Sequence, residues 1–147
     1  MFQANDRIAR QAGDTTILIN NGAIYPKGDL LTAPAEDITA TIATNLLGPI
    51  HLTRALAPAL RSAKGALVNI GSVLSWFAIG KAHSVSKAGL WMATNAFRLE
   101  LAPSDVAAAI FDAVEAGDHE LIVDELTTQV HTALSAPVTA LYPALAQ

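Results

Sequence analysis

Short runs of apolar residues alternate along this chain with longer segments of helical periodicity. The runs span residues 15–20, 65–70 and 120–123, and the first is rich in β-branched side chains. The apolar residues of this first run are consecutive rather than alternating, which is typical of a strand buried on both faces of a parallel sheet. We therefore expect three strands, with the chain crossing over between them.

The segments between these runs predict helices. Residues 32–61 carry an apolar stripe at helical spacing, and Thr32 and Pro34 suit its N-terminal cap and first turn. Further helices are expected over 82–102, 105–115 and 124–134. Strands alternating with helices predict the α/β class, with a parallel sheet of about three strands flanked by helices.

One proline inside the first long helix changes its expected geometry. Pro49 has no backbone N–H, so the carbonyl of Asn45, four residues earlier, loses its intrahelical partner. We expect the helix to bend there and to leave a carbonyl that can hold a water molecule. Taken alone, the spacing favours a kink that serves only packing.

Composition narrows the class of protein. The chain has 147 residues, which predicts one domain, and 52% of them are hydrophobic. No apolar run reaches the roughly 18 residues of a membrane span, and we expect no membrane contact. Nine basic and thirteen acidic residues give a net charge of −4 without a basic cluster, which disfavours nucleic-acid binding.

The absence of cysteine excludes disulfides and thiolate metal sites. No apolar leader follows Met1, so the expected location is cytoplasmic. His51, His119 and His131 are scattered, and no metal-ligand set emerges from the sequence.

Candidate chemistry gathers between the second expected strand and the second long helix. Ser72 follows the strand, and His83 and Lys87 are four residues apart at the start of the helix. His83 and Lys87 therefore lie on one helix face, and the loop after the strand can bring Ser72 to them, so all three side chains can meet in one cleft. The turn at 20–23 carries small residues that let a ligand approach the backbone, although an ordinary turn explains it equally well.

Four motifs stand in a specific order along residues 15–101. They are N-N-G-A at 20–23, N-L-L-G-P-I-H-L-T-R-A from 45, V-N-I-G-S at 68–72 and H-S-V-S-K-A-G-L from 83. Together they resemble the short-chain dehydrogenase/reductase family. The resemblance implies a Rossmann-type fold, NAD or NADP as cofactor, and a small carbonyl or alcohol substrate.

The resemblance also implies residue roles. The cofactor-binding turn corresponds to Asn20, Asn21, Gly22 and Ala23, with the last two exchanged relative to the family order. Asn45 corresponds to the helix asparagine whose carbonyl holds a water, and Ser72 to the serine that binds the substrate oxygen. Lys87 corresponds to the lysine that binds the nicotinamide ribose and lowers the pKa of the catalytic acid.

His83 stands where the family has its catalytic tyrosine. A neighbouring lysine helps a tyrosine by drawing its pKa of about 10 toward neutrality. The same positive charge disfavours a protonated imidazole, so we expect His83 to be mostly neutral and a weaker proton donor than tyrosine. The shorter ring is also less suited to reach the substrate oxygen.

Part of the family pattern is missing. No Gly-rich phosphate loop is present, so we expect residues 1–147 to form a single partial domain without the N-terminal phosphate-binding βαβ half. The expected strand after Leu101 is also absent. With its neighbour missing, the strand at 15–20 is expected to present an apolar edge that promotes self-association.

Three functional interpretations follow. The chain is an oxidoreductase acting on a carbonyl/alcohol pair, or a degenerate relative with weak or no activity that serves as a dimerisation or ligand-binding module. In either case we expect a homo-oligomer formed through helices 32–61 and 83–102. The third interpretation, a serine hydrolase using Ser84 and Lys87 in S-x-x-K spacing, lacks the accompanying motifs.

Overall fold

The structure is a computed structural model that describes residues 7–8, 10–101 and 132. Its strands are β1 (Ile17–Asn20) and β2 (Ala66–Asn69), and its long helices are α2 (Ala35–Ile42), α3 (Gly48–Ala63) and α4 (Ala82–Glu100). A π-helical segment, η1 (Ala43–Leu47), joins α2 to α3, and two 3-10 turns, η2 (Val73–Ser75) and η3 (Ala78–Gly80), precede α4.

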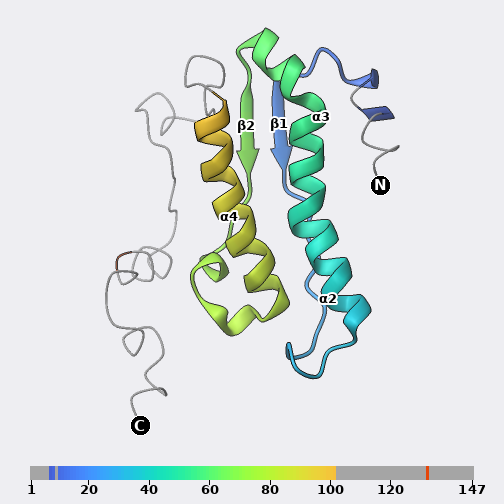
Figure 1. The fold of residues 1–147 in the computed structure, drawn as a ribbon, viewed down its shortest axis with the longest axis vertical. Helices are drawn as coiled ribbons and strands as arrows, with labels where there is room; N and C mark the ends of the chain where they lie inside the picture. Colours follow the sequence, from blue (N-terminus) through green and yellow to red (C-terminus); the bar gives the residue numbers. More distant parts are fainter. Residues whose placement is uncertain (1–6, 9, 102–131, 133–147) are drawn as a thin grey trace.

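The two strands pair in parallel, with Ile17 opposite Ala66 and Asn20 opposite Asn69. Helix α3 packs on both strands and α4 on β2, so the two helices lie side by side against the sheet (Figure 1). The α/β class and the parallel arrangement are therefore confirmed. The expected strand at 120–123 and the helices beyond residue 101 lie outside the described residues.

The core lies between the sheet and the two long helices. Its buried apolar side chains include Leu56 and Leu60 from α3, Leu90 from α4 and Val68 from β2. Ile17 and Ile19 of β1 are 52% and 58% exposed, although they belong to an apolar strand. Successive strand residues face opposite sides, so one side of β1 packs inward while the other presents isoleucines.

The first long helix is one continuous rod made of α2, η1 and α3 (Figure 1). The prediction that Thr32 caps it is wrong: the helix begins at Ala35, Pro34 occupies the cap position, and no side chain caps it. Pro34 can do this because its fixed φ suits a helix entry. The distortion expected near Pro49 takes the form of the π-helical segment, in which the N–H of Gly48 bonds to the carbonyl of Ala43.

The turn from α3 into β2 depends on close backbone packing. Lys64 adopts a left-handed conformation with φ of 49°, and the N–H of Gly65 bonds back to the carbonyl of Leu60. A Cβ atom on Gly65 would lie 2.1 Å from the carbonyl oxygen of Thr16. Only glycine therefore lets the chain pass beside β1 and start β2 in register.

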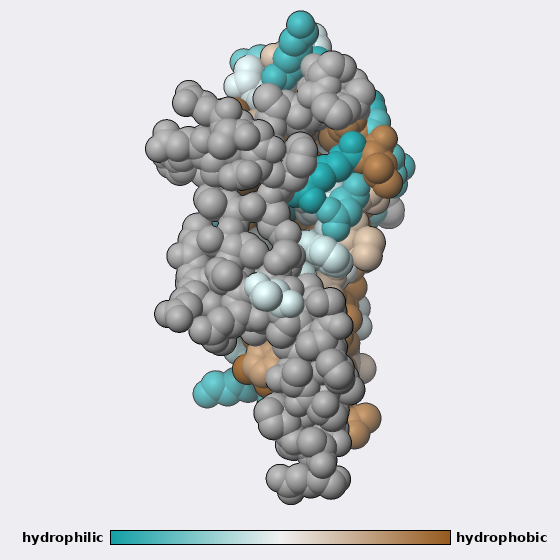
Figure 2. Space-filling view, turned by 90° about the vertical axis from the view of Figure 1, so that its left-hand side faces the viewer, coloured by the Kyte–Doolittle hydropathy of each residue, from teal (hydrophilic) through white to brown (hydrophobic). Residues whose placement is uncertain are grey.

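Exposed large apolar side chains occur on several elements, including Leu99 of α4 at 88% and Leu31 of the loop at 97%. On the face shown in Figure 2, brown apolar surface and teal hydrophilic surface lie next to each other in the described part. Within the described residues, no helix combines the length and the hydropathy that crossing a membrane requires.

Candidate active site

A chain of side-chain hydrogen bonds joins the carboxyl ends of both strands to both helices. The amide of Asn20 donates to Asn69 Oδ1 at 2.8 Å, and Asn69 Nδ2 donates to Thr94 Oγ1 of α4 at 2.8 Å. A longer contact of 3.4 Å runs from Asn20 Nδ2 to Thr53 Oγ1 of α3. Asn20 is 7% exposed, and its side chain holds the carboxyl ends of the two strands together beneath the site.

Asn45 is the hub of the site. Its Oδ1 accepts from the backbone N–H of Ile24 at 2.8 Å, and its Nδ2 donates to the carbonyl of Ile24 at 2.9 Å and to Ser86 Oγ at 3.0 Å. The side chain is 1% exposed and therefore cannot exchange these partners for water. Asn45 thus fixes the loop after β1 against α4.

His83 contacts both Asn45 and the backbone of Ile24. Its Nδ1 is 3.2 Å from the carbonyl oxygen of Ile24 and 3.3 Å from Asn45 Nδ2. The ring of Tyr25 meets the imidazole edge-on, with centroids 4.9 Å apart and planes at 78°. The histidine is therefore held on one nitrogen by the backbone and on its ring by an aromatic neighbour.

Lys87 lies one turn further along α4 and is 4% exposed. Its Nζ donates to the carbonyl of Ile70 at 2.5 Å. Burial lowers the pKa of Lys87 from its ordinary value of 10.5. An ammonium has three N–H donors, and Ile70 is its one hydrogen-bond partner among the described residues, so two donors are left for a ligand.

Ser72 lies at the entrance to η2, which packs against α4. Its Oγ accepts from the N–H of Leu74 at 3.1 Å, which leaves the hydroxyl proton to donate elsewhere. Within residues 10–101 no hydrogen bond joins Ser72 to His83 or Lys87 directly.

The hydrolase interpretation fails on Ser84. This side chain is 5% exposed, its Oγ donates to the carbonyl of Phe77 at 2.7 Å, and it accepts from the N–H of Gly80 at 3.0 Å. A hydroxyl occupied on both sides and shielded from solvent is not a nucleophile. Ser84 instead fixes the turn η3 onto the start of α4.

The turn at 21–23 is open. Asn21, Gly22 and Ala23 are all exposed, and a Cβ atom added to Gly22 would meet nothing within 4 Å. The backbone of this turn is therefore accessible to a ligand.

Sequence reasoning missed three parts of the site. Ser86, which is fully buried against Asn45, stood only within the motif that starts at His83, and Tyr25, which packs on His83, was not singled out. An ion pair of 2.6 Å joins Lys81 to Asp29 and ties the loop before α2 to the turn beside His83. Hydrogen bonding to Asp29 raises the pKa of Lys81. Only contacts between distant segments identify these residues.

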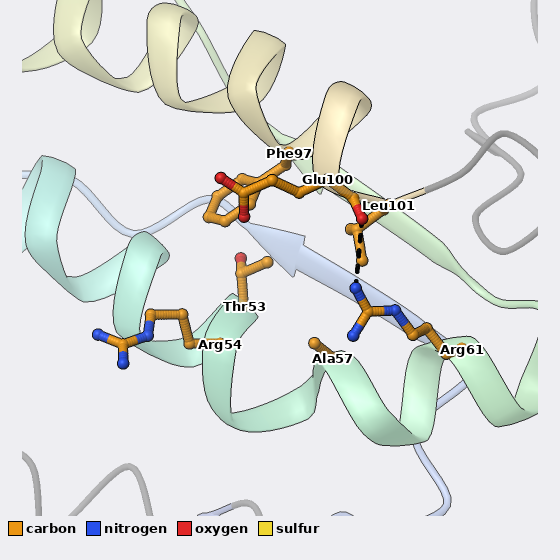
Figure 3. A pocket seen from close by; sticks show the side chains of 7 residues that line it. All are labelled: Thr53, Arg54, Ala57, Arg61, Phe97, Glu100 and Leu101. Atoms are coloured by element: carbon orange, nitrogen blue, oxygen red, sulfur yellow. Dashed lines mark hydrogen bonds between the residues drawn. The ribbon is translucent and has the colours of Figure 1, made fainter.

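A separate pocket of about 210 Å³ lies between α3 and the C-terminal end of α4 (Figure 3). It is lined by Thr53, Arg54, Ala57, Arg61, Phe97, Glu100 and Leu101. Arg61 spans one side by donating to the backbone carbonyl of Glu100 at 3.3 Å. Apart from Thr53, which contacts Asn20, this pocket shares no residue with the site described above. The described residues contain no group of side chains that could hold a metal ion.

This arrangement of motifs and contacts has counterparts in known proteins. A model of the short chain dehydrogenase family matches residues 1–114. The chain belongs to the short-chain dehydrogenase family. The resemblance inferred from the four motifs is thereby confirmed at the level of the family.

Curated relatives from this family are considerably longer than the chain. A 17-beta-hydroxysteroid dehydrogenase 13 from Mus musculus is 43% identical over 75 residues, which cover 50% of this chain and 24% of the relative. Retinol dehydrogenase 5 from Mus musculus is 34% identical over 111 residues, covering 71% of this chain and 34% of the relative. The matching segments thus span about a quarter to a third of these relatives.

Solved structures show the same fold. A short chain dehydrogenase from Burkholderia cenocepacia J2315 in complex with NADP superposes with a TM-score of 0.83 and 28% identity, covering 100% of this chain and 75% of that one. A gluconate 5-dehydrogenase from the same organism, in complex with NADP and tartrate, has a TM-score of 0.64 and 25% identity over 73% of this chain and 43% of that one. The Rossmann-type architecture is therefore confirmed.

Proposed function

We propose that this chain carries the hydride-transfer site of an NAD(P)-dependent oxidoreductase that interconverts a small alcohol and its carbonyl compound. The observation that carries the proposal is Lys87, a buried ammonium with two unused N–H donors one helical turn from His83. Burying a cation is unfavourable unless a partner compensates it. Ribose hydroxyls of a nicotinamide cofactor are partners of the right chemistry.

The remaining residues have complementary roles in this proposal. Ser72 donates its hydroxyl proton to the substrate oxygen, and His83 exchanges a proton with that oxygen. Asn45 holds the loop after β1 and the start of α4 together, so it positions both. Residues 20–23 lie along the cofactor; when bound, the nicotinamide supplies or accepts the hydride. The NADP found with two structural neighbours supports this cofactor class.

A second function is favoured by a specific observation, the histidine at the family's tyrosine position. On this alternative the chain is a degenerate relative, and its site binds a ligand or supports dimerisation without catalysing hydride transfer. The homo-oligomer expected through helices 32–61 and 83–102 belongs to both proposals, as does the cytoplasmic location expected from composition.

Turnover separates the two functions. The chain is incubated with NAD or NADP and a panel of small alcohols, and with NADH or NADPH and the matching ketones, while nicotinamide absorbance is followed. We expect turnover that falls at least about 100-fold in Lys87→Met, because a positioned charge-assisted contact is lost. Absence of turnover with every pair, in a chain that binds the cofactor, would support the non-catalytic alternative.

A further inference from the structure

The hydrogen bonds around His83 determine which of its ring nitrogens carries the proton in the neutral form. Asn45 Nδ2 has two hydrogens. Its two shorter contacts, to the carbonyl of Ile24 at 2.9 Å and to Ser86 Oγ at 3.0 Å, use both of them. Ser86 can accept because its own proton goes to the carbonyl of His83 at 2.7 Å.

The third contact of Asn45 Nδ2, to His83 Nδ1 at 3.3 Å, therefore has no hydrogen left for it. The other neighbour of Nδ1 is the carbonyl oxygen of Ile24 at 3.2 Å, which has a second lone pair and can only accept. Nδ1 must then be the donor. A neutral imidazole with its proton on Nδ1 has a free lone pair on Nε2.

We infer that His83 is held as the Nδ1–H tautomer and that Nε2 acts as a general base toward an alcohol substrate. This inference rests on the proposed function and assigns alcohol oxidation as the direction that starts from the neutral imidazole. None of the described residues forms a hydrogen bond with Nε2, so this nitrogen is left for a ligand.

The step balances as follows. The O–H bond of the alcohol breaks, and its proton forms a new N–H bond at Nε2. The C–H bond on the same carbon breaks, and its hydrogen leaves with both electrons to the oxidised nicotinamide, while the carbon–oxygen bond becomes double. The imidazolium then releases one proton to solvent. The reverse reaction needs the imidazolium at the outset.

Several other charged or titratable groups lie around His83. Tyr25 packs against the ring, and Lys81 precedes it on the same turn, paired with Asp29. Lys87 follows one turn later in α4. Helix α2, which packs against α4, carries Glu36 and Asp37 in its first turn. A change in rate is therefore assigned to His83 only by comparison with variants of His83 itself.

The tautomer is measured independently of activity by two-bond 1H–15N correlation NMR on the 15N-labelled chain, with His83→Gln identifying the resonances. In the neutral form of the ring, we expect a protonated Nδ1 and an unprotonated Nε2. Ser86→Ala should shift the population toward Nε2–H, since it frees one hydrogen of Asn45 Nδ2. Ser84→Ala, a neighbouring serine without contact to Asn45, should not. A proton on Nε2 in the unmodified chain would overturn the inference.

The base role is tested by rates. We expect His83→Gln to lower alcohol oxidation by about 100-fold or more. Oxidation unaffected by His83→Gln would overturn the base role while the proposed function stands. Absence of turnover in both directions would overturn the proposed function and the base role, whereas the NMR result would still establish the tautomer.

Discussion

At the scale of single residues, Asn45 shows how a polar side chain can organise a site without touching substrate. The sequence indicates Asn45 only through its backbone carbonyl, which loses its intrahelical partner to Pro49. The structure adds a side chain that bonds both backbone groups of Ile24 and the hydroxyl of Ser86. The sequence could indicate the position, because of the proline, but these partners lie 21 and 41 residues away, where local spacing carries no information.

Asn45→Ala should destabilise the fold by about 3 kcal/mol, because it leaves buried partners of the amide unsatisfied at about 1–3 kcal/mol each. Urea unfolding followed by tryptophan fluorescence measures this change. Asn95→Ala, which removes an exposed asparagine–arginine contact on α4, is the matched control and should stay within about 0.5 kcal/mol. Equal effects of the two substitutions would contradict the role of Asn45 as a hub.

The lowered pKa of Lys87 makes the free energy of unfolding depend on pH. Because burial lowers its pKa, the unfolded chain binds more protons than the folded chain between that lowered value and the ordinary 10.5. The free energy of unfolding should therefore rise with pH through this window. Lys87→Met removes the titrating group, so it should be more stable than the unmodified chain at about pH 7, with a gap that closes toward about pH 10. Urea unfolding at both pH values measures the gap; a gap independent of pH would be inconsistent with a buried ammonium.

At the scale of elements, apolar runs and helical stripes located the described strands and long helices to within a few residues. The start of the first helix was missed because Thr32 is a good cap residue by type, whereas Pro34 occupies that place without any side-chain bond. The loop at 70–81 could not be predicted, since η2 and η3 depend on the hydroxyls of Ser72 and Ser84 binding nearby backbone groups. The predicted elements beyond residue 101 stay predictions.

The end of α3 offers a stabilising substitution. Lys64 holds a left-handed conformation at φ of 49°, which is unfavourable for a residue with a Cβ atom and natural for glycine. Lys64→Gly should raise the free energy of unfolding by about 1 kcal/mol, measured by thermal and urea unfolding. Lys64→Ala removes the same charge but keeps the Cβ, so it should bring no comparable gain; a gain equal to that of glycine would refute the conformational explanation.

At the scale of the whole molecule, the described sheet has an uncovered apolar strand. β1 pairs only with β2 among the described residues, and Ile17 and Ile19 are more than half exposed. Edges of this kind promote association. The expected oligomer therefore has two candidate surfaces, the β1 edge and the long helices.

We predict that the chain self-associates at micromolar concentration and that Ile17→Lys combined with Ile19→Lys shifts light scattering toward the monomer. Leu99→Lys places the same charge on α4, where the side chain is 88% exposed, and tests the helix surface. If only Leu99→Lys dissociates the assembly, the helices form the contact and the strand prediction is wrong. A monomer before any substitution would contradict both surfaces.

If Lys87 and its neighbours form a nicotinamide site, the chain must bind NADH or NADPH, and the affinity for these cofactors can be measured. NADH and NADPH are titrated into the chain while nicotinamide fluorescence is followed, in parallel with Lys87→Met and with Lys64→Met, a lysine substitution at the opposite end of the sheet. We expect saturable binding that Lys87→Met weakens at least about tenfold, as expected for the loss of a hydrogen bond to a charged group, and that Lys64→Met leaves unchanged. No saturable binding, or equal affinity in the chain and in Lys87→Met, would contradict a nicotinamide site at Lys87.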